Sequence, residues 1–76
     1  MNASGLSITA CLAEISCRLT DAAAIARAAL SCAEAGLERE AVRIATKLDT
    51  LMHEAETLHG AVCLIGRLQR DAEAAT

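Results

Sequence analysis

The chain of 76 residues contains no Phe, Tyr or Trp, no Pro and only four Gly. Without proline, no helix interior loses a backbone donor, and without aromatic rings there are no stacking platforms for single-stranded nucleic acid. Strand-forming residues are scarce and never alternate with polar residues over a useful run. Because Ala, Leu, Glu and Arg are abundant, the composition predicts an all-α fold.

Positive charge is also sparse. Seven Lys and Arg oppose ten Asp and Glu, which gives a net charge of −3 and a pI near 5.2. The basic residues are spread along the chain without a dense stripe, so we expect no binding to nucleic acid or to an anionic membrane surface. No uncharged run reaches the roughly 18–20 residues that span a bilayer, and Met1–Gly5 lacks the positive start of a signal peptide. A soluble, cytoplasmic protein is therefore expected.

The residues that usually carry chemistry form no clear site. His53 and His59 are six positions apart and face different sides of a helix, so they cannot serve jointly as acid and base. His59 and Cys63 share a helix face with Glu56, but structural zinc normally takes four ligands, and no matching pair occurs elsewhere. We therefore predict no catalytic residue, no metal site, no cofactor and no small-molecule substrate.

Four cysteines fall inside predicted helices without a C-x-x-C pair, at Cys11, Cys17, Cys32 and Cys63. A cross-linked scaffold is normally rich in loops, whereas a cysteine in a helix is most often a small buried hydrophobe. Reduced, structural thiols are the favoured interpretation. Disulfides or a reactive thiol are the alternative.

The clearest positive signal is an apolar residue at every third or fourth position between residues 41 and 65. The members of this seam are Ala41, Ile44, Leu48, Leu51, Ala55, Leu58, Val62 and Ile65. Such a repeat over more than three heptads predicts a long helix that lies against other helices.

A second stripe with the same spacing marks an earlier helix. Its members are Ile8, Leu12, Ile15, Leu19, Ala22, Ala26, Ala29 and Ala33. Ser7 is a suitable N-cap for this helix, with residues 1–6 as a frayed terminus. The alanine-rich half is expected to pack closely on its neighbour. A restart at Thr20–Asp21 is possible, but without Gly or Pro there a continuous helix is favoured.

Gly36 separates the two stripes. Glycine readily adopts the positive φ that closes a helix, and Leu37 could add the accompanying hydrophobic contact. Glu38 and Glu40 then suit the first turn of the next helix, although no Ser, Thr, Asp or Asn caps it. The sequence predicts one domain, residues 1–76, folded as an antiparallel hairpin of helices at about 7–35 and 37–73. One unbroken helix is the alternative, because an interior Gly costs only about 1 kcal/mol relative to Ala.

The segment 58–68 is apolar nearly all the way round, which is typical of a helix that is buried all round. The residues predicted to bind a partner or a second copy are Leu58, Gly60, Ala61, Val62, Leu64, Ile65 and Leu68. The alternative is that this segment is the centre of the protein's own bundle. Hydrophobic residues make up 54% of the chain, and a single seam between two helices cannot bury that many. We therefore expect a four-helix bundle dimer or a heterocomplex.

Two segments resemble known families. Ala29, Gly36 and Ala41 occupy the small-residue and turn positions of a single tetratricopeptide-type hairpin, which supports a turn at Gly36. Residues 57–71, with Leu58, Gly60-Ala61, Val62, Leu64-Ile65 and Leu68, resemble the last helix of the small E-type co-chaperones of type III secretion needle subunits. That resemblance implies an acidic helical hairpin that pairs with a tetratricopeptide-type partner and keeps the needle subunit soluble. It covers about a fifth of the chain, and the first fifty residues match in architecture only.

The favoured function is a non-enzymatic protein–protein interaction module, a small adaptor or chaperone that binds a partner helix through residues 58–68. The alternative is a small acidic homodimeric regulator or inhibitor of another macromolecule. Its binding would depend on the acidic residues Glu38, Glu40, Asp49, Glu54 and Glu56. A third possibility, a bundle subunit of a larger assembly, has the same sequence signature as the first.

Overall fold

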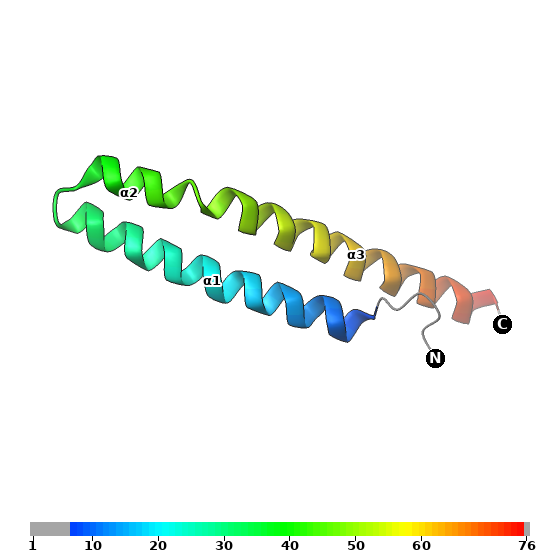
Figure 1. Ribbon diagram of the computed structural model, residues 1–76. Helices are drawn as coiled ribbons and strands as arrows, with labels where there is room; N and C mark the ends of the chain where they lie inside the picture. Colours follow the sequence, from blue (N-terminus) through cyan, green and yellow to red (C-terminus); the bar gives the residue numbers. More distant parts are fainter. Residues whose placement is uncertain (1–6, 76) are drawn as a thin grey trace.

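The computed structural model describes residues 7–75, which form an elongated antiparallel helical hairpin (Figure 1). Helix α1 spans Ile8–Glu34, α2 spans Glu38–Ala45 and α3 spans Leu48–Ala75. Helix α1 is the first arm, and α2 and α3 follow one another along the second arm. There is no strand within the described range. The predicted all-α hairpin is therefore confirmed.

Helix α1 begins and continues as its sequence predicts. The Ala10 N–H donates to Ser7 Oγ at 2.9 Å, so Ser7 is the N-cap. The helix passes through Thr20 without a break, and Thr20 Oγ1 donates to the Ser16 carbonyl oxygen at 2.9 Å. The favoured continuous helix is therefore confirmed. The frayed segment expected at residues 1–6 lies outside the described residues.

The turn between the arms is built around Gly36, whose φ is +83°. The Gly36 N–H donates to the Ala33 carbonyl oxygen at 3.0 Å, and the Leu37 N–H donates to the Cys32 carbonyl oxygen at 2.8 Å. These two bonds form a Schellman motif, which satisfies the last carbonyl groups of α1. Leu37 itself is exposed, and α2 starts without a side-chain cap, as its sequence suggests.

The second arm differs from the predicted single helix at 37–73, because it is interrupted at Thr46 and Lys47. Thr46 Oγ1 donates to the Arg43 carbonyl oxygen at 2.6 Å. The Lys47 N–H donates to the Ile44 carbonyl oxygen at 3.0 Å, and the Asp49 N–H to that of Thr46 at 3.2 Å. These bonds reach back three residues, as in a 3₁₀ turn, and the threonine hydroxyl competes with the helical pattern.

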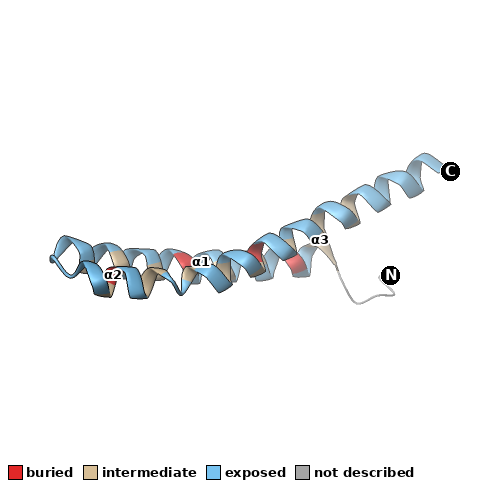
Figure 2. Ribbon diagram, turned by 90° about the horizontal axis from the view of Figure 1, so that it is seen from above, coloured by how far each residue is buried: buried red, intermediate tan, exposed pale blue. Residues whose placement is uncertain are grey.

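The seam on the second arm follows the prediction across this interruption. Every predicted member from Ala41 to Ile65 is buried or half-buried. The residues buried most completely are small, and among the described residues they are Cys11, Ala22, Ala41 and Ala55 (Figure 2). The hairpin thus brings its helices together over small side chains and leaves most large ones partly in solvent.

On α1 the predicted packing stripe is wrong at alternate positions. The residues that are buried or half-buried at 4-3 spacing along α1 are Cys11, Ile15, Arg18, Ala22, Ile25, Ala29 and Cys32. Leu12, Leu19, Ala26 and Ala33 of the predicted stripe are exposed. The physical reason is that the apolar face of α1 is wider than one neighbour can cover. The second arm covers only the flank that carries Cys11 and Cys32.

Candidate functional site

The open end of the hairpin is where α3 outruns α1. Residues 67–75 are all exposed, and the last turns of α3 extend past the start of α1 (Figures 1 and 2). The segment 58–68 therefore lies at an end of the molecule, with α1 available on one side only. The hairpin by itself does not surround this segment.

The seven predicted site residues divide between two sides of α3. Leu58, Val62 and Ile65 belong to the seam and are half-buried, and Ala61 is also half-buried. Gly60 is exposed. Leu64 and Leu68 are 46% and 57% exposed, on a side of the helix that α1 leaves uncovered. The sequence prediction grouped residues that the structure separates into a packed set and a free set.

Gly60 is not required by the packing of the hairpin. A Cβ atom added at Gly60 would meet nothing within 4 Å. A Cβ atom added at Gly66 would lie 3.9 Å from Arg70 Nη1, which is an ordinary contact. The exposed backbone at Gly60 is therefore not in contact with the other arm of the hairpin, and another helix could approach it closely.

The thiols divide in the same way. All four cysteines are free, with Cys11 buried, Cys32 half-buried and Cys17 and Cys63 exposed. Cys11 and Cys32 fit the prediction of small buried hydrophobes, whereas Cys17 and Cys63 do not. Cys63 Sγ lies 3.5 Å from His59 Nε2. Within residues 7–75, no group of three or more His, Cys, Asp or Glu side chains is placed to hold a metal ion.

Charged side chains are partly engaged in ion pairs. Arg18 lies on the α1 seam, pairs with Glu14 on its own helix, and has its Nε 3.5 Å from Glu54 Oε1 on α3. Arg43 hydrogen-bonds Glu40 with both its Nε, at 3.1 Å from Oε2, and its Nη2. The hydrogen bond from Arg43 lowers the pKa of Glu40 below its ordinary value, and Glu40 in turn raises the pKa of Arg43.

The sequence interpretation missed an apolar groove that runs between α1 and α3. Its volume is about 510 Å³, and it is lined by Leu12, Ile15, Leu19, Met52, Ala55, Glu56 and His59. A sequence signal was present, since Leu12 and Leu19 are seven residues apart, and so are Met52 and His59. The prediction placed the two leucines against the other arm, whereas they remain at the surface.

Comparison of the chain with models of known protein families, with curated proteins and with solved structures finds no match. Among the described helices, none combines the length and apolar character needed to cross a membrane. The fold thus defines a small all-α hairpin with uncovered apolar surface.

Proposed function

We propose that the chain is a non-enzymatic protein–protein interaction module, a small adaptor or chaperone that binds a partner helix along the C-terminal part of α3. The observation that supports this proposal is the exposure of Leu64 and Leu68 beside Gly60 and Ala61. Large aliphatic side chains one turn apart are typical anchors for a helix that lies in a groove.

The two kinds of residue in this strip have different roles. Leu64 and Leu68 supply the apolar area that a partner would bury, and a fully buried leucine contributes roughly 1.5–3 kcal/mol. Gly60 and Ala61 let the backbone of a partner helix come close at the other end of the strip. Leu58, Val62 and Ile65 hold α3 on α1 and offer their remaining exposed edges to the partner.

A partner that supplies two helices would complete a four-helix bundle around the hairpin. The resemblance of residues 57–71 to the E-type co-chaperones favours a chaperone role in which a tetratricopeptide-type protein supplies those helices. A cytoplasmic location remains part of this proposal. The acidic-regulator alternative has less support, because Glu40 and Glu54 are already paired with arginines of the same chain.

The test is affinity capture from a lysate of the source cells with the full chain, followed by identification of the captured protein. The double variant Leu64→Glu/Leu68→Glu is expected to lose a partner that the wild type retains. Thr50→Glu/Gln69→Glu adds the same charge at exposed positions of α3 and is expected to retain it. If both variants and the wild type capture the same protein equally, and their masses in solution agree, the proposed site is wrong.

Gly60 provides a sharper test, because stability and binding should change in opposite directions. Gly60→Ala adds a methyl group to open space in the hairpin and should stabilise the helix by about 1 kcal/mol. The same methyl group should weaken capture of the partner by interfering with close approach. Gly66→Ala is the matched control, with a similar gain in stability and no loss of capture. Equal capture by both variants would remove Gly60 from the site.

A further inference from the structure

Helix α1 carries two interleaved, mostly apolar seams that share Ile15, Ala22 and Ala29. The first seam is the covered flank that packs on the second arm, and its other members are Cys11, Arg18, Ile25 and Cys32. The second seam is exposed at its other members, which are Leu12, Leu19, Ala26 and Ala33. A helix inside a four-helix bundle packs against two neighbours and needs an apolar face wide enough for both. The hairpin supplies α1 with only one.

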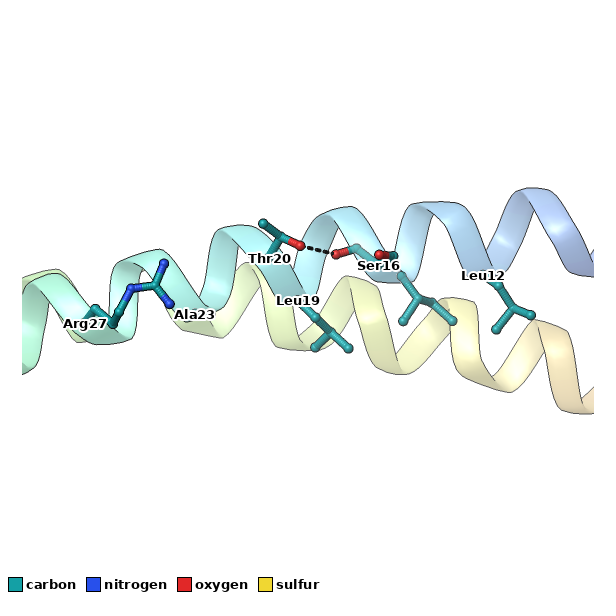
Figure 3. Close-up of a pocket in the computed structure, with 7 residues that line it drawn as sticks. Leu12, Ser16, Leu19, Thr20, Ala23 and Arg27 are labelled. Atoms are coloured by element: carbon teal, nitrogen blue, oxygen red, sulfur yellow. Dashed lines mark hydrogen bonds between the residues drawn. The ribbon is translucent and has the colours of Figure 1, made fainter.

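The exposed seam of α1 continues onto α3 through the apolar groove described above. Leu12 and Leu19 project from the same side of α1 (Figure 3). They lie two helical turns apart, about 10.5 Å along the axis, and so do Met52 and His59 on α3. The small Ala55 lies between Met52 and His59. The two walls of the groove therefore present large side chains at the same spacing.

We infer that a second copy of this chain covers the groove, with a twofold axis along the rod. This axis places α1 of each copy antiparallel on α3 of the other, so that Leu12 and Leu19 meet the partner's Met52 and His59. Because the axis runs along the rod, each groove residue keeps its height along the rod in both copies, and the same patch of each copy forms the contact, which makes it isologous. This inference rests on the proposed helix-packing function but uses a different side of α3 from Leu64 and Leu68.

The surface area of the chain favours a second copy as the occupant. The chain exposes 5702 Å², whereas a compact monomer of 7.9 kDa is expected to expose about 4,400 Å². The excess exceeds the ~800 Å² that each partner buries in a standard interface. Glu56 is the one charged residue that lines the groove, so the groove lacks the charge pattern that selects a foreign partner of opposite sign.

The test is absolute mass by light scattering, with far-ultraviolet circular dichroism, on the reduced full chain. The wild type is expected at twice its chain mass of 7.9 kDa. Leu12→Lys/Leu19→Lys is expected at the mass of one chain. Ala13→Lys/Ala24→Lys adds the same charge on an exposed part of α1 away from the groove and is expected to remain a dimer.

A milder variant keeps the test decisive if the lysine variant unfolds. Leu19→Ala preserves helix propensity and should raise the dimer Kd by about 100-fold or more, because both copies lose the side chain. The inference is overturned by a fully helical wild-type monomer, by an unchanged Kd in Leu19→Ala, or by dimers that dissociate only when Leu64 and Leu68 are changed. The proposed function fails separately, since capture of the partner is measured with variants that leave the groove intact.

Discussion

Gly36 is the residue on which the hairpin depends most directly. Its φ of +83° lies in the region that L-residues avoid, and both bonds of the Schellman motif are formed there and at Leu37. A Cβ atom at this position would meet nothing within 4 Å. The cost of a side chain at Gly36 therefore comes from the backbone conformation alone.

Gly36→Ala is expected to destabilise the protein by about 1–2 kcal/mol, the cost of holding an L-residue in the left-handed conformation. Urea unfolding followed by circular dichroism at fixed protein concentration measures this change. Gly66→Ala, the stabilising control on α3, should shift the midpoint in the opposite direction. If Gly36→Ala is neutral or stabilising, the chain tolerates a turn without a positive φ, and the two arms need not meet as described.

Arg18 shows how a single residue can set the register of the arms. It lies on the covered flank of α1 between Ile15 and Ala22, and its buried Nε has no hydrogen-bond partner. Its nearest opposite charge on the other arm is Glu54, at 3.5 Å. A partly exposed ion pair of this kind contributes at most about 1 kcal/mol. The ion pair matters more for the register of the two arms, because any other register would leave Arg18 in the seam without Glu54 beside it. A charged side chain in a seam specifies alignment in this way, at some cost in stability.

At the scale of the element, we attribute the interruption between α2 and α3 to a local cause. The hydroxyl of Thr46 donates to the Arg43 carbonyl oxygen, so it occupies an acceptor that a regular helix would offer to an amide. Threonine also has a lower helix propensity than alanine, by up to roughly 0.7 kcal/mol. The seam stays in phase across the interruption, so the apolar pattern is equally compatible with one continuous helix.

Thr46→Ala is therefore expected to join α2 and α3 into one helix and to raise stability by about 0.5 kcal/mol. The measurements are carbon chemical shifts at residues 45–48, hydrogen exchange of the Lys47 amide, and urea unfolding. Thr50→Ala, at an exposed position inside α3, should give the same gain in propensity without slowing exchange at Lys47. An interruption that survives in Thr46→Ala would mean that contact with α1 imposes it.

The elements also show what a sequence can and cannot specify. The seam from Ala41 to Ile65 could be predicted in full, because its large residues lie on one narrow stripe. The stripe on α1 could not, since the apolar face of α1 is wider than one neighbour can cover and the sequence does not specify which flank of that face the second arm covers. In the structure the second arm packs on the flank with Cys11 and Ile25, and Leu12 and Leu19 are exposed. The site predicted on 58–68 was inferred from composition, but the division of this segment into packed and free sides depends on where α1 begins.

At the scale of the whole molecule, the hairpin is a rod of 61 × 17 × 15 Å with little interior. Small chains rarely obtain more than about 3–5 kcal/mol from their own core. Here the most deeply buried residues within 7–75 are one cysteine and three alanines. The proposed partner site and the proposed dimer groove would each remove large exposed residues from water. In this interpretation, association completes the fold and is not a secondary property of a finished domain.

Both proposed contacts are apolar, so their dependence on salt distinguishes them from binding through an acidic surface. Raising the salt from about 0.05 M to about 0.5 M shortens the Debye length roughly threefold and should weaken acidic-surface binding strongly. The dimer Kd, measured by sedimentation equilibrium, is expected to stay level or fall slightly, because two copies of net charge −3 repel less in salt.

Capture of the partner should likewise persist at the higher salt concentration. The variant Glu38→Gln/Asp49→Asn should leave capture of the partner unchanged. Capture that is lost in salt, or lost in this neutralised variant, would instead favour the acidic regulator, with the exposed carboxylates and not Leu64 and Leu68 as the binding groups.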